Sequence, residues 1–503
     1  MSRIIDEKTL SQIKNLNYKL TPFKPNENKP KAKHIVRDKI VDMKTAIKNC
    51  GLKDGMTISF HHHFRGGDLT VKHVMETIKD LKIKKLTIAS SSFTDAHNFL
   101  TTYIEDGYVV GLETSGCRDE LGRFISSGKC PKPMIIRSHG GRARAIESGD
   151  LKIDVAFIAA SSSDCLGNSN GTIGKSLCGS LGYAMVDAKY ATKTIIITDT
   201  IVDYPNQKKS ISQSDVDWVV KVDTIGDSKK IVGGEIRLTS APKEEIIAKN
   251  IGKIVTNTSL FQDGFSIQMG SGGASLSAIK VIKEEMIKRN IKASFCLGGI
   301  TSHQVKLLDE GLVERLIDTQ CFDYGAVESI SNNANHMEIS ASEYANPSNK
   351  SPFVNKLDYV ILSALEVDLD FNVNVITGSD GIIRGASGGH SDTADGAKIS
   401  IIALPLIRGR ISCISEKVNT IITPGNTVDI VVSDFGIAVN PIRTDLIKEL
   451  KEKNIPLITL SQMKEMAESV IGVAKPIDFD YSKPVAVVEY RDGSVIDVVY
   501  KVK

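Results

Sequence analysis

The sequence predicts an α/β fold in which one unit is used twice. Short β-branched runs such as 195–198 alternate with amphipathic helical patterns along most of the chain. This alternation favours mainly parallel sheets covered by helices on both faces. The run 54–60 (Asp-Gly-Met-Thr-Ile-Ser-Phe) returns at 263–269 (Asp-Gly-Phe-Ser-Ile-Gln-Met), and each copy leads into a glycine-rich loop and a helical pattern. A strand, a loop and a helix used twice indicate two duplicated domains with two anion-handling loops.

The duplication extends well beyond these two strands. Three further pairs of segments match in the same order: 153–160 with 357–364, 168–170 with 372–374, and 188–191 with 397–400. All these pairs are 204 or 209 positions apart. Matches in one order at a nearly constant spacing predict a true internal repeat.

The bulk composition excludes several classes of protein. A chain of 503 residues is too long for one compact core, so we expect at least two domains. The net charge of +3 gives no reason to expect nucleic-acid binding, and no apolar run reaches the length of a membrane span. The N-terminus lacks the apolar segment of a signal peptide, and the eight cysteines include no Cys-x-x-Cys pair. We therefore expect a cytoplasmic protein with reduced thiols.

Changes in composition predict the domain boundaries. The start of the chain is rich in Lys, Asn and Pro, which is typical of an extended arm. Near the end, two strand patterns flank Asp492-Gly493, which predicts a β-hairpin, interpreted as an appendage of the second domain. The expected parts are an N-terminal arm at 1–35, a first domain at 36–225, a crossing at 226–255, a second domain at 256–475 and the hairpin at 476–503.

The run His61-His62-His63 allows three interpretations. Alternate strand residues point the same way, so His61 and His63 could bind a metal, although no third ligand has a useful spacing. The cluster could also be a packed, hydrogen-bonded part of the core. In the third interpretation, one or two imidazoles line a site and bind a carboxylate. Arg65, in the following Arg-Gly-Gly-Asp run, favours this last interpretation because a guanidinium binds carboxylates bidentately.

The second glycine-rich loop, 270–273 (Gly-Ser-Gly-Gly), lies between a strand and a helix. Glycines let the backbone approach a phosphate or an acyl oxygen, and amides at a helix start favour negative charge. Tight packing would select the same glycines, so the signal is weak. The loop is neither a Rossmann fingerprint nor a P-loop.

The most distinctive polar segment is 384–394 (Arg-Gly-Ala-Ser-Gly-Gly-His-Ser-Asp-Thr-Ala). Small residues beside His390 and Asp392 are what an oxyanion site needs, because its donors must lie close to the developing charge. A purely structural turn is the alternative. In the first half, Glu113 ends a predicted strand, which is where α/β sheets bind ligands. Glu113 could be a base, a nucleophile or only a helix cap.

Four segments together resemble the citrate lyase α subunit family, the citrate:acetyl-acyl-carrier-protein transferases of the CoA-transferase superfamily. They are 54–68 (DGMTISFHHHFRGGD), 270–275 (GSGGAS), 363–374 (SALEVDLDFNVN) and 387–394 (SGGHSDTA). The resemblance covers nearly the whole chain, and HHHFRGGD is its most specific part. It implies two CoA-transferase-like domains (NagB/RpiA/CoA-transferase type) with the active site between the halves.

The resemblance also implies an activity and partners. The reaction would exchange the acetyl group on a carrier thiol for citryl and release acetate during citrate fermentation, with acetyl-CoA as a surrogate donor. No cofactor would be bound covalently to this chain, because CoA or the CoA-derived prosthetic group of a carrier is the co-substrate. The partners would be a lyase β subunit and a γ acyl carrier protein in an oligomer, without nucleic acid or membrane.

The resemblance and the motifs together give a set of expected site residues, with no metal. The expected catalytic residues are Glu113, His390 and Asp392. The expected substrate-binding residues are His61, His62, His63, Arg65, Gly66, Asp68, Ser115, Gly116, Asn372 and Asn374. The expected CoA or thioester loop comprises Gly270, Ser271, Gly272, Gly273, Glu366, Ser387, Gly388 and Gly389.

One departure from related enzymes bears on the mechanism. CoA-transferases that form a covalent glutamyl thioester place this Glu soon after the second glycine loop, whereas the equivalent stretch here, 295–299, has no carboxylate. Direct transfer in a ternary complex is therefore favoured, with Glu113 and Glu366 as reserve nucleophiles. The alternatives are an acetate- or hydroxyacid-type CoA-transferase or acyl-CoA hydrolase with a covalent Glu, a scaffold subunit with a degenerate site, and a sugar-phosphate isomerase of related topology.

Overall fold

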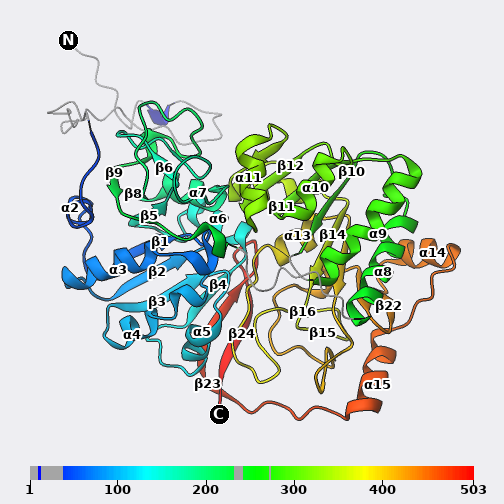
Figure 1. The fold of residues 1–503 in the computed structure, drawn as a ribbon. Helices are drawn as coiled ribbons and strands as arrows, with labels where there is room; N and C mark the ends of the chain where they lie inside the picture. The colour runs from blue at the N-terminus through cyan, green and yellow to red at the C-terminus, as the bar shows by residue number, and fades with distance from the viewer. Residues whose placement is uncertain (1–9, 13–37, 232–241, 271–272) are drawn as a thin grey trace. The chain divides into compact units, whose positions relative to one another are not determined.

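Two mainly parallel β-sheets form the framework of the computed structural model, which describes residues 10–12, 38–231, 242–270 and 273–503. The first sheet has the strand order β24-β23-β4-β3-β2-β1-β5-β8-β9, and the second has the order β13-β12-β11-β10-β14-β17-β21-β22. Helices flank both sheets (Figure 1). The predicted α/β class with mainly parallel sheets is confirmed.

The elements of the first half are α2 (Met43–Asn49), β1 (Thr57–Phe60), α3 (Thr70–Asp80), β2 (Leu86–Ser90), α4 (Leu100–Glu105), β3 (Val109–Thr114), α5 (Asp119–Ser126), β4 (Met134–Arg137), α6 (His139–Ser148), β5 (Val155–Ala159), β6 (Ser162–Ser163), β7 (Ser169–Asn170), α7 (Gly182–Tyr190), β8 (Lys193–Thr198) and β9 (Trp218–Lys221). The second half begins with α8 (Pro242–Asn257), β10 (Phe265–Met269), α9 (Gly273–Arg289), β11 (Ala293–Ile300), α10 (Ser302–Asp309), β12 (Leu316–Cys321), α11 (Tyr324–Asn332), β13 (His336–Glu338), α12 (Ala341–Ala345) and β14 (Tyr359–Ser363). It continues with β15 (Glu366–Asp368), β16 (Val373–Asn374), α13 (His390–Gly396), β17 (Ile399–Ala403), β18 (Ile407–Arg408), β19 (Ile411–Ser412), β20 (Ile414–Ser415), β21 (Ile430–Ser433), β22 (Gly436–Val439), α14 (Thr444–Glu452), α15 (Leu460–Ile471), β23 (Phe479–Glu489) and β24 (Val495–Val502).

The predicted duplication is visible in the strand orders and in matched hydrogen bonds. The order β4-β3-β2-β1-β5-β8-β9 corresponds to β13-β12-β11-β10-β14-β17-β21. Asp54 accepts a hydrogen bond from the amide of Lys84 (2.7 Å), and Asp263 accepts one from the amide of Lys292 (2.9 Å). Each carboxylate ties the turn before the first strand of its repeat to the segment before the second strand, so the repeated Asp-Gly has the same role in both halves.

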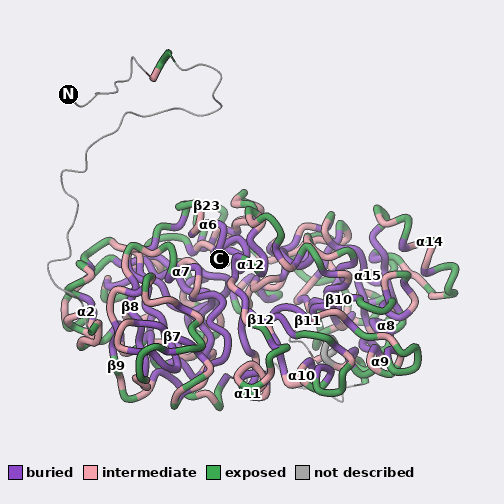
Figure 2. Tube along the Cα trace, turned by 90° about the horizontal axis from the view of Figure 1, so that it is seen from above, coloured by how far each residue is buried: buried purple, intermediate pink, exposed green. Residues whose placement is uncertain are grey.

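The core follows from the strand sequences. Every residue of β2, β5 and β10 is buried, as expected for parallel strands covered by helices on both faces. Figure 2 shows the buried segments in the interior and the exposed ones mainly on outer loops and helix faces. No helix among the described residues is both long enough and apolar enough to cross a bilayer.

The C-terminal hairpin is present, but its predicted place on the second domain is wrong. β23 pairs in parallel with β4, with Ala486 opposite Met134, so the hairpin extends the first sheet (Figure 1, red strands). Arg137 of β4 forms ion pairs with both Glu489 of β23 and Glu113 of β3. The open edge of β4 and this charge pairing explain the location, because an edge strand offers unpaired amides and carbonyls.

The predicted crossing at 226–255 overlaps α8, which packs against α9 of the second half. Residues 232–241 lie outside the described residues, as does the predicted arm apart from residues 10–12. Residues 39–503, which contain both sheets, form one compact unit.

Candidate functional site

A cavity of about 450 Å³ lies where the two halves meet. Its walls come largely from residues at or just after the carboxyl ends of strands in both sheets. From the first half these include His62 after β1, Ser92 after β2, Ser115 after β3 and His139 after β4; from the second half they include Gly270 after β10, Phe322 after β12 and Ala364 after β14. The carboxyl ends of parallel strands are the usual ligand-binding edge of α/β sheets. We take this cavity as the candidate site.

The charge of the cavity is one-sided. Four arginines line it: Arg65, Arg118, Arg384 and Arg408. Arg384 is ion-paired with Asp380, which lies outside the lining, and Arg408 donates to the carbonyls of Ala364 and Leu365. None of the described residues that line it is Asp or Glu. Guanidinium groups stay charged at any physiological pH and bind carboxylates bidentately, so the cavity suits a ligand with several carboxylates.

Arg65 occupies an unusual backbone position. Its φ is +51°, a left-handed conformation that is costly for a residue other than glycine. Its amide donates to the carbonyl of His62 (2.9 Å), and its own carbonyl accepts the hydroxyl of Thr94 (3.1 Å). Its guanidinium lies 4.9 Å from the centre of the Phe322 ring of the second half. Neighbouring groups from both halves therefore hold Arg65 at the cavity wall.

The three histidines separate as strand alternation predicts. The rings of His61 and His63 stack at 5.9 Å, whereas His62 faces the cavity. His61 pairs with buried Asp187 at 3.2 Å, and His63 bonds the carbonyl of Ala159 at 3.1 Å. Burial lowers the pKa of His63 to about 3. His61 and His63 are thus packed core residues that do not line the cavity, and only His62 of the run does.

Three further expected substrate-binding residues serve the local structure. Asp68 accepts the amide of Val71 at the start of α3 (3.1 Å) and lies 3.4 Å from His97. Gly66 sits against the carboxylate of Asp95, and a Cβ on Gly116 would overlap the side chain of Ala386 in the other half. These residues shape the loops, whereas the neighbouring Ser115 does line the cavity.

The repeated Asn-x-Asn motif does the same structural work in both halves. Asn374 accepts the amides of Ile376 and Thr377 at 2.9 and 3.0 Å, just as Asn170 accepts two amides, both at 3.0 Å. The side chain of Asn372 donates to Asp368 at 3.1 Å. Neither Asn372 nor Asn374 lines the cavity. In both halves the motif stabilises a turn through side-chain hydrogen bonds.

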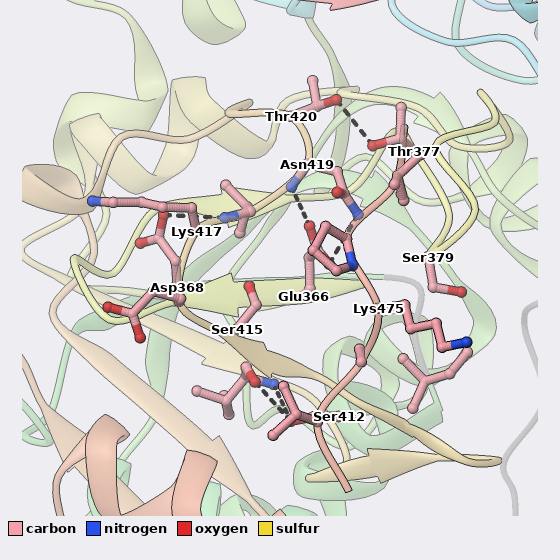
Figure 3. Close-up of a pocket in the computed structure, with 18 of the residues that line it drawn as sticks. Glu366, Asp368, Thr377, Ser379, Ser412, Ser415, Lys417, Asn419, Thr420 and Lys475 are labelled. Atoms are coloured by element: carbon pink, nitrogen blue, oxygen red, sulfur yellow. Dashed lines mark hydrogen bonds between the residues drawn. The ribbon is translucent and has the colours of Figure 1, made fainter. Parts of the chain in front are cut away.

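The two reserve carboxylates also lie outside the cavity lining. Glu113 is ion-paired with Arg137. Glu366 lines a separate cavity of about 770 Å³, where it accepts the amide of Asn419 at 2.5 Å (Figure 3). Burial raises the pKa of Glu366. Both carboxylates therefore have structural partners away from the arginine-lined cavity.

The segment 387–390 does reach the cavity, but its polar groups are largely engaged. Ser387, Gly388, Gly389 and His390 line the wall. His390 uses both ring nitrogens inside the protein, on the hydroxyl of Thr423 (2.7 Å) and the carbonyl of Ser363 (3.2 Å). Burial lowers its pKa to about 4. The ring of His390 therefore anchors the loop, and neither nitrogen is left for a proton transfer.

Asp392 lies beneath the wall and links the two halves. It is fully buried, and it accepts the hydroxyl of Ser138 (2.7 Å) and the amide of Gly140 (2.8 Å). Arg491 of the hairpin turn lies 3.7 Å away, and burial raises the pKa of Asp392 to about 6. Asp392 does not line the cavity. Its carboxylate instead holds Ser138 and Gly140, the two residues next to His139.

The second glycine loop is only partly described. Gly270 lines the cavity, but its amide donates to the carbonyl of Ile361 at 2.7 Å and is not available to a ligand. Ser271 and Gly272 lie outside the described residues, and Gly273 begins α9.

Several cavity residues were not among the expected site residues. Arg384 and Gln268 lie in segments that the sequence analysis had singled out, whereas the others lie outside these motifs: Arg118, His139, Tyr183, Tyr344 and Arg408. Arg118 and His139 follow the ends of β3 and β4, so the strand-end rule that selected Glu113 could have pointed to both. The remaining residues converge only through tertiary structure.

Comparisons with known proteins agree with this architecture. Residues 37–502 match the family described as citrate lyase, alpha subunit. The citrate lyase alpha chain of Haemophilus influenzae is 52% identical over 461 residues, 92% of each chain. That of Klebsiella pneumoniae is 51% identical over 466 residues, again 92% of each chain.

A solved structure shows the same fold over the whole chain. It is the putative alpha subunit of citrate lyase from Streptococcus mutans in complex with citrate, 49% identical, with a TM-score of 0.91 and coverage of 100% of this chain and 99% of that one. The matches in sequence and in fold extend over both halves and the cavity between them. The chain belongs to the citrate lyase alpha subunit family.

Proposed function

We propose that this chain exchanges the acetyl group of a carrier thioester for citryl and releases acetate. Its family gives the reaction class, and the observation that carries the proposal is the cavity with four arginines and no carboxylate among its described lining residues. Citrate presents three carboxylates, which Arg65, Arg118, Arg384 and Arg408 are suited to bind.

The same cavity favours direct transfer in a ternary complex. A citrate carboxylate adds to the thioester carbonyl, and collapse of the tetrahedral adduct expels the thiolate and leaves a mixed anhydride. The thiolate then attacks the citryl carbonyl and expels acetate. A covalent route needs a carboxylate nucleophile at the wall, whereas Glu113 and Glu366 both lie outside the lining.

The donor and the partners belong to the same proposal. The thioester would lie along Ser387, Gly388 and Gly389 of the cavity wall, where Gly389 leaves room for the hydroxyl of Tyr344, which a Cβ would overlap. The physiological donor would be an acyl carrier protein with a CoA-derived arm, and a lyase subunit would cleave the citryl product. Acetyl-CoA would replace the carrier in vitro, and a cytoplasmic location remains a prediction.

A direct assay tests the proposal. Purified protein is mixed with acetyl-CoA and citrate, and citryl-CoA and acetate are measured by mass spectrometry. We expect both products from the wild type. Arg65→Gly relaxes the left-handed backbone but removes the cation, so we expect weaker citrate binding, whereas Arg65→Lys should retain more of it. If folded wild-type protein forms no citryl-CoA at millimolar substrate, the proposal is refuted.

A trapping experiment addresses the covalent alternative. A free carboxylate does not react with hydroxylamine or borohydride, whereas a glutamyl thioester does, so we expect no labelled Glu after treatment with acetyl-CoA. A label on Glu113 or Glu366 would replace direct transfer by a covalent mechanism.

A further inference from the structure

Three aromatic side chains from the first half form a contact cluster at the cavity wall. His62 follows β1, His139 begins α6 and Tyr183 lies in the first turn of α7. The ring of Tyr183 lies 5.4 Å from that of His62 and 4.3 Å from that of His139, and the two imidazoles are 5.8 Å apart. All three residues are buried and line the cavity. We call them the aromatic triad.

The contacts of His62 with Ser91 allow its Nδ1 to act as a hydrogen-bond acceptor. The hydroxyl oxygen of Ser91 accepts the backbone amide of His62 (3.1 Å) and lies 2.6 Å from His62 Nδ1. We assign the hydroxyl hydrogen of Ser91 to Nδ1 as the acceptor, which places the ring proton of His62 on Nε2, for which the described residues provide no acceptor.

His139 and Tyr183 also keep a donor for a ligand. The Nδ1 of His139 is buried and has no partner among the described residues. A proton on Nδ1 would therefore be unsatisfied, so it belongs on Nε2, the nitrogen nearest to Gly388 of the cavity wall. The hydroxyl of Tyr183 donates to no described residue and is not among the buried polar atoms that lack a partner. Each member of the triad thus has one donor that the described part of the protein leaves unused.

The triad is uncharged. Burial holds the pKa of His62 well below its ordinary value, helped by His139 and Arg65. Burial and Arg142 lower the pKa of His139 to about 3, and burial raises the pKa of Tyr183 well above 10. Around neutral pH the cavity therefore combines permanent arginine cations with neutral donors that keep their protons.

The proposed exchange needs donors of this kind. When a carboxylate adds to the thioester, the new C–O bond sends the carbonyl π pair onto oxygen, and collapse sends the C–S pair to the thiolate. The second half of the exchange repeats these steps with the thiolate as nucleophile. No proton is transferred in either half, so the protein must supply hydrogen bonds to the oxyanion rather than a base.

We propose that His62 Nε2–H, His139 Nε2–H and the Tyr183 hydroxyl form the oxyanion site, while the arginines hold the carboxylates. This inference rests on the proposed function, and it moves His62 from carboxylate binding to the reacting oxygen. Donors that act only on the developing charge raise kcat, whereas the arginines act on ground-state binding.

Substitution of the two new members tests the assignment. Loss of one oxyanion donor costs roughly 100- to 1,000-fold in kcat, so we expect a loss of that order in Tyr183→Phe and His139→Met. Citrate Kd, measured by calorimetry, should stay within about threefold of the wild type. His139→Gln keeps a neutral N–H and should recover part of kcat. The matched control is Tyr190→Phe, in the same helix but 44% exposed, which should behave as the wild type.

The other possible results separate failure of the proposed function from failure of the oxyanion assignment. A wild type that makes no citryl-CoA refutes the proposed function itself. An active wild type with kcat retained within twofold in Tyr183→Phe and His139→Met overturns only the oxyanion assignment. Weakened citrate binding at unchanged kcat would make these residues carboxylate ligands, and a kcat that falls tenfold per pH unit below pH 7 would make one of them a base. Either result also overturns the assignment.

Discussion

Arg491 offers a test of how the C-terminal hairpin supports the site. Its side chain is 4% exposed and lies 3.7 Å from the carboxylate of the fully buried Asp392. Arg491 donates hydrogen bonds to Asp395 (2.6 Å) and to the carbonyl of Ala345 (3.1 Å). Arg491→Met preserves much of the side-chain volume but leaves Asp392 without a cation. Removal of one partner of a buried ion pair costs about 3–5 kcal/mol.

The size of the expected shift in melting temperature follows from the length of the chain. At about 2.1 cal/mol/K per residue, the unfolding entropy of a chain of this size is roughly 1 kcal/mol/K, so a loss of about 4 kcal/mol lowers Tm by about 4 °C. Because Asp392 holds the residues on both sides of His139, we also expect kcat to fall.

A double-mutant cycle isolates the charge effect. Asp392→Asn keeps a carbonyl oxygen for Ser138 or Gly140 but has no charge to bury. Asp392→Asn combined with Arg491→Met should therefore be less destabilised than the sum of the single variants by roughly 1–3 kcal/mol. The measurements are thermal melts and citryl-CoA formation. Strict additivity, or a Tm of Arg491→Met equal to that of the wild type, would refute the reasoning.

Three further predictions concern pH, packing and the reserve nucleophiles. Four buried histidines, His62, His63, His139 and His390, have a pKa below the ordinary value in the folded state. Their contribution to stability is therefore complete above pH 6.5 and is lost as the pH falls from 6.5 toward 3. Between pH 7.5 and 5.5 the loss is at most roughly 1.3 kcal/mol for each, or roughly 5 kcal/mol in total, and a Tm that does not fall over this range would contradict it. Gly116→Ala should lower Tm because its Cβ would overlap the facing half, whereas Gly66→Ala, which meets only the movable carboxylate of Asp95, should cost less; equal melts would contradict the packing. Glu113→Gln and Glu366→Gln should keep citryl-CoA formation within about tenfold, whereas loss of a covalent nucleophile would cost far more, so an inactive but folded variant would favour the covalent route.

The strands and turns of the fold could be predicted from the sequence because their causes are local. Hydrophobic runs and Asp-Gly turns recur in both halves, and these patterns are encoded over a few neighbouring residues. The alternation of His61, His62 and His63 depends only on the two-residue period of an extended chain. It correctly placed His62 apart from the other two.

The sequence was less informative where polar residues have two equally plausible uses. Asn372, Asn374 and Asp392 occur in distinctive motifs, yet their side chains accept backbone amides of the protein itself, those of Gly425, Ile376 and Gly140. A buried polar group must find a partner, and that requirement explains such residues without any contact to substrate. A polar motif near a loop is therefore better evidence for a hydrogen-bonded loop than for a substrate contact.

The sequence by itself determined the α/β class, the duplication, the family and the cationic loop with His62 and Arg65. Only the tertiary structure decided that the C-terminal hairpin joins the first sheet and that His139 and Tyr183 meet His62. It also brought Arg384 and Arg408 to a wall shared with Arg65. The reason is physical: strand and turn patterns are encoded over a few neighbouring residues, whereas a site between two halves depends on contacts between residues hundreds of positions apart.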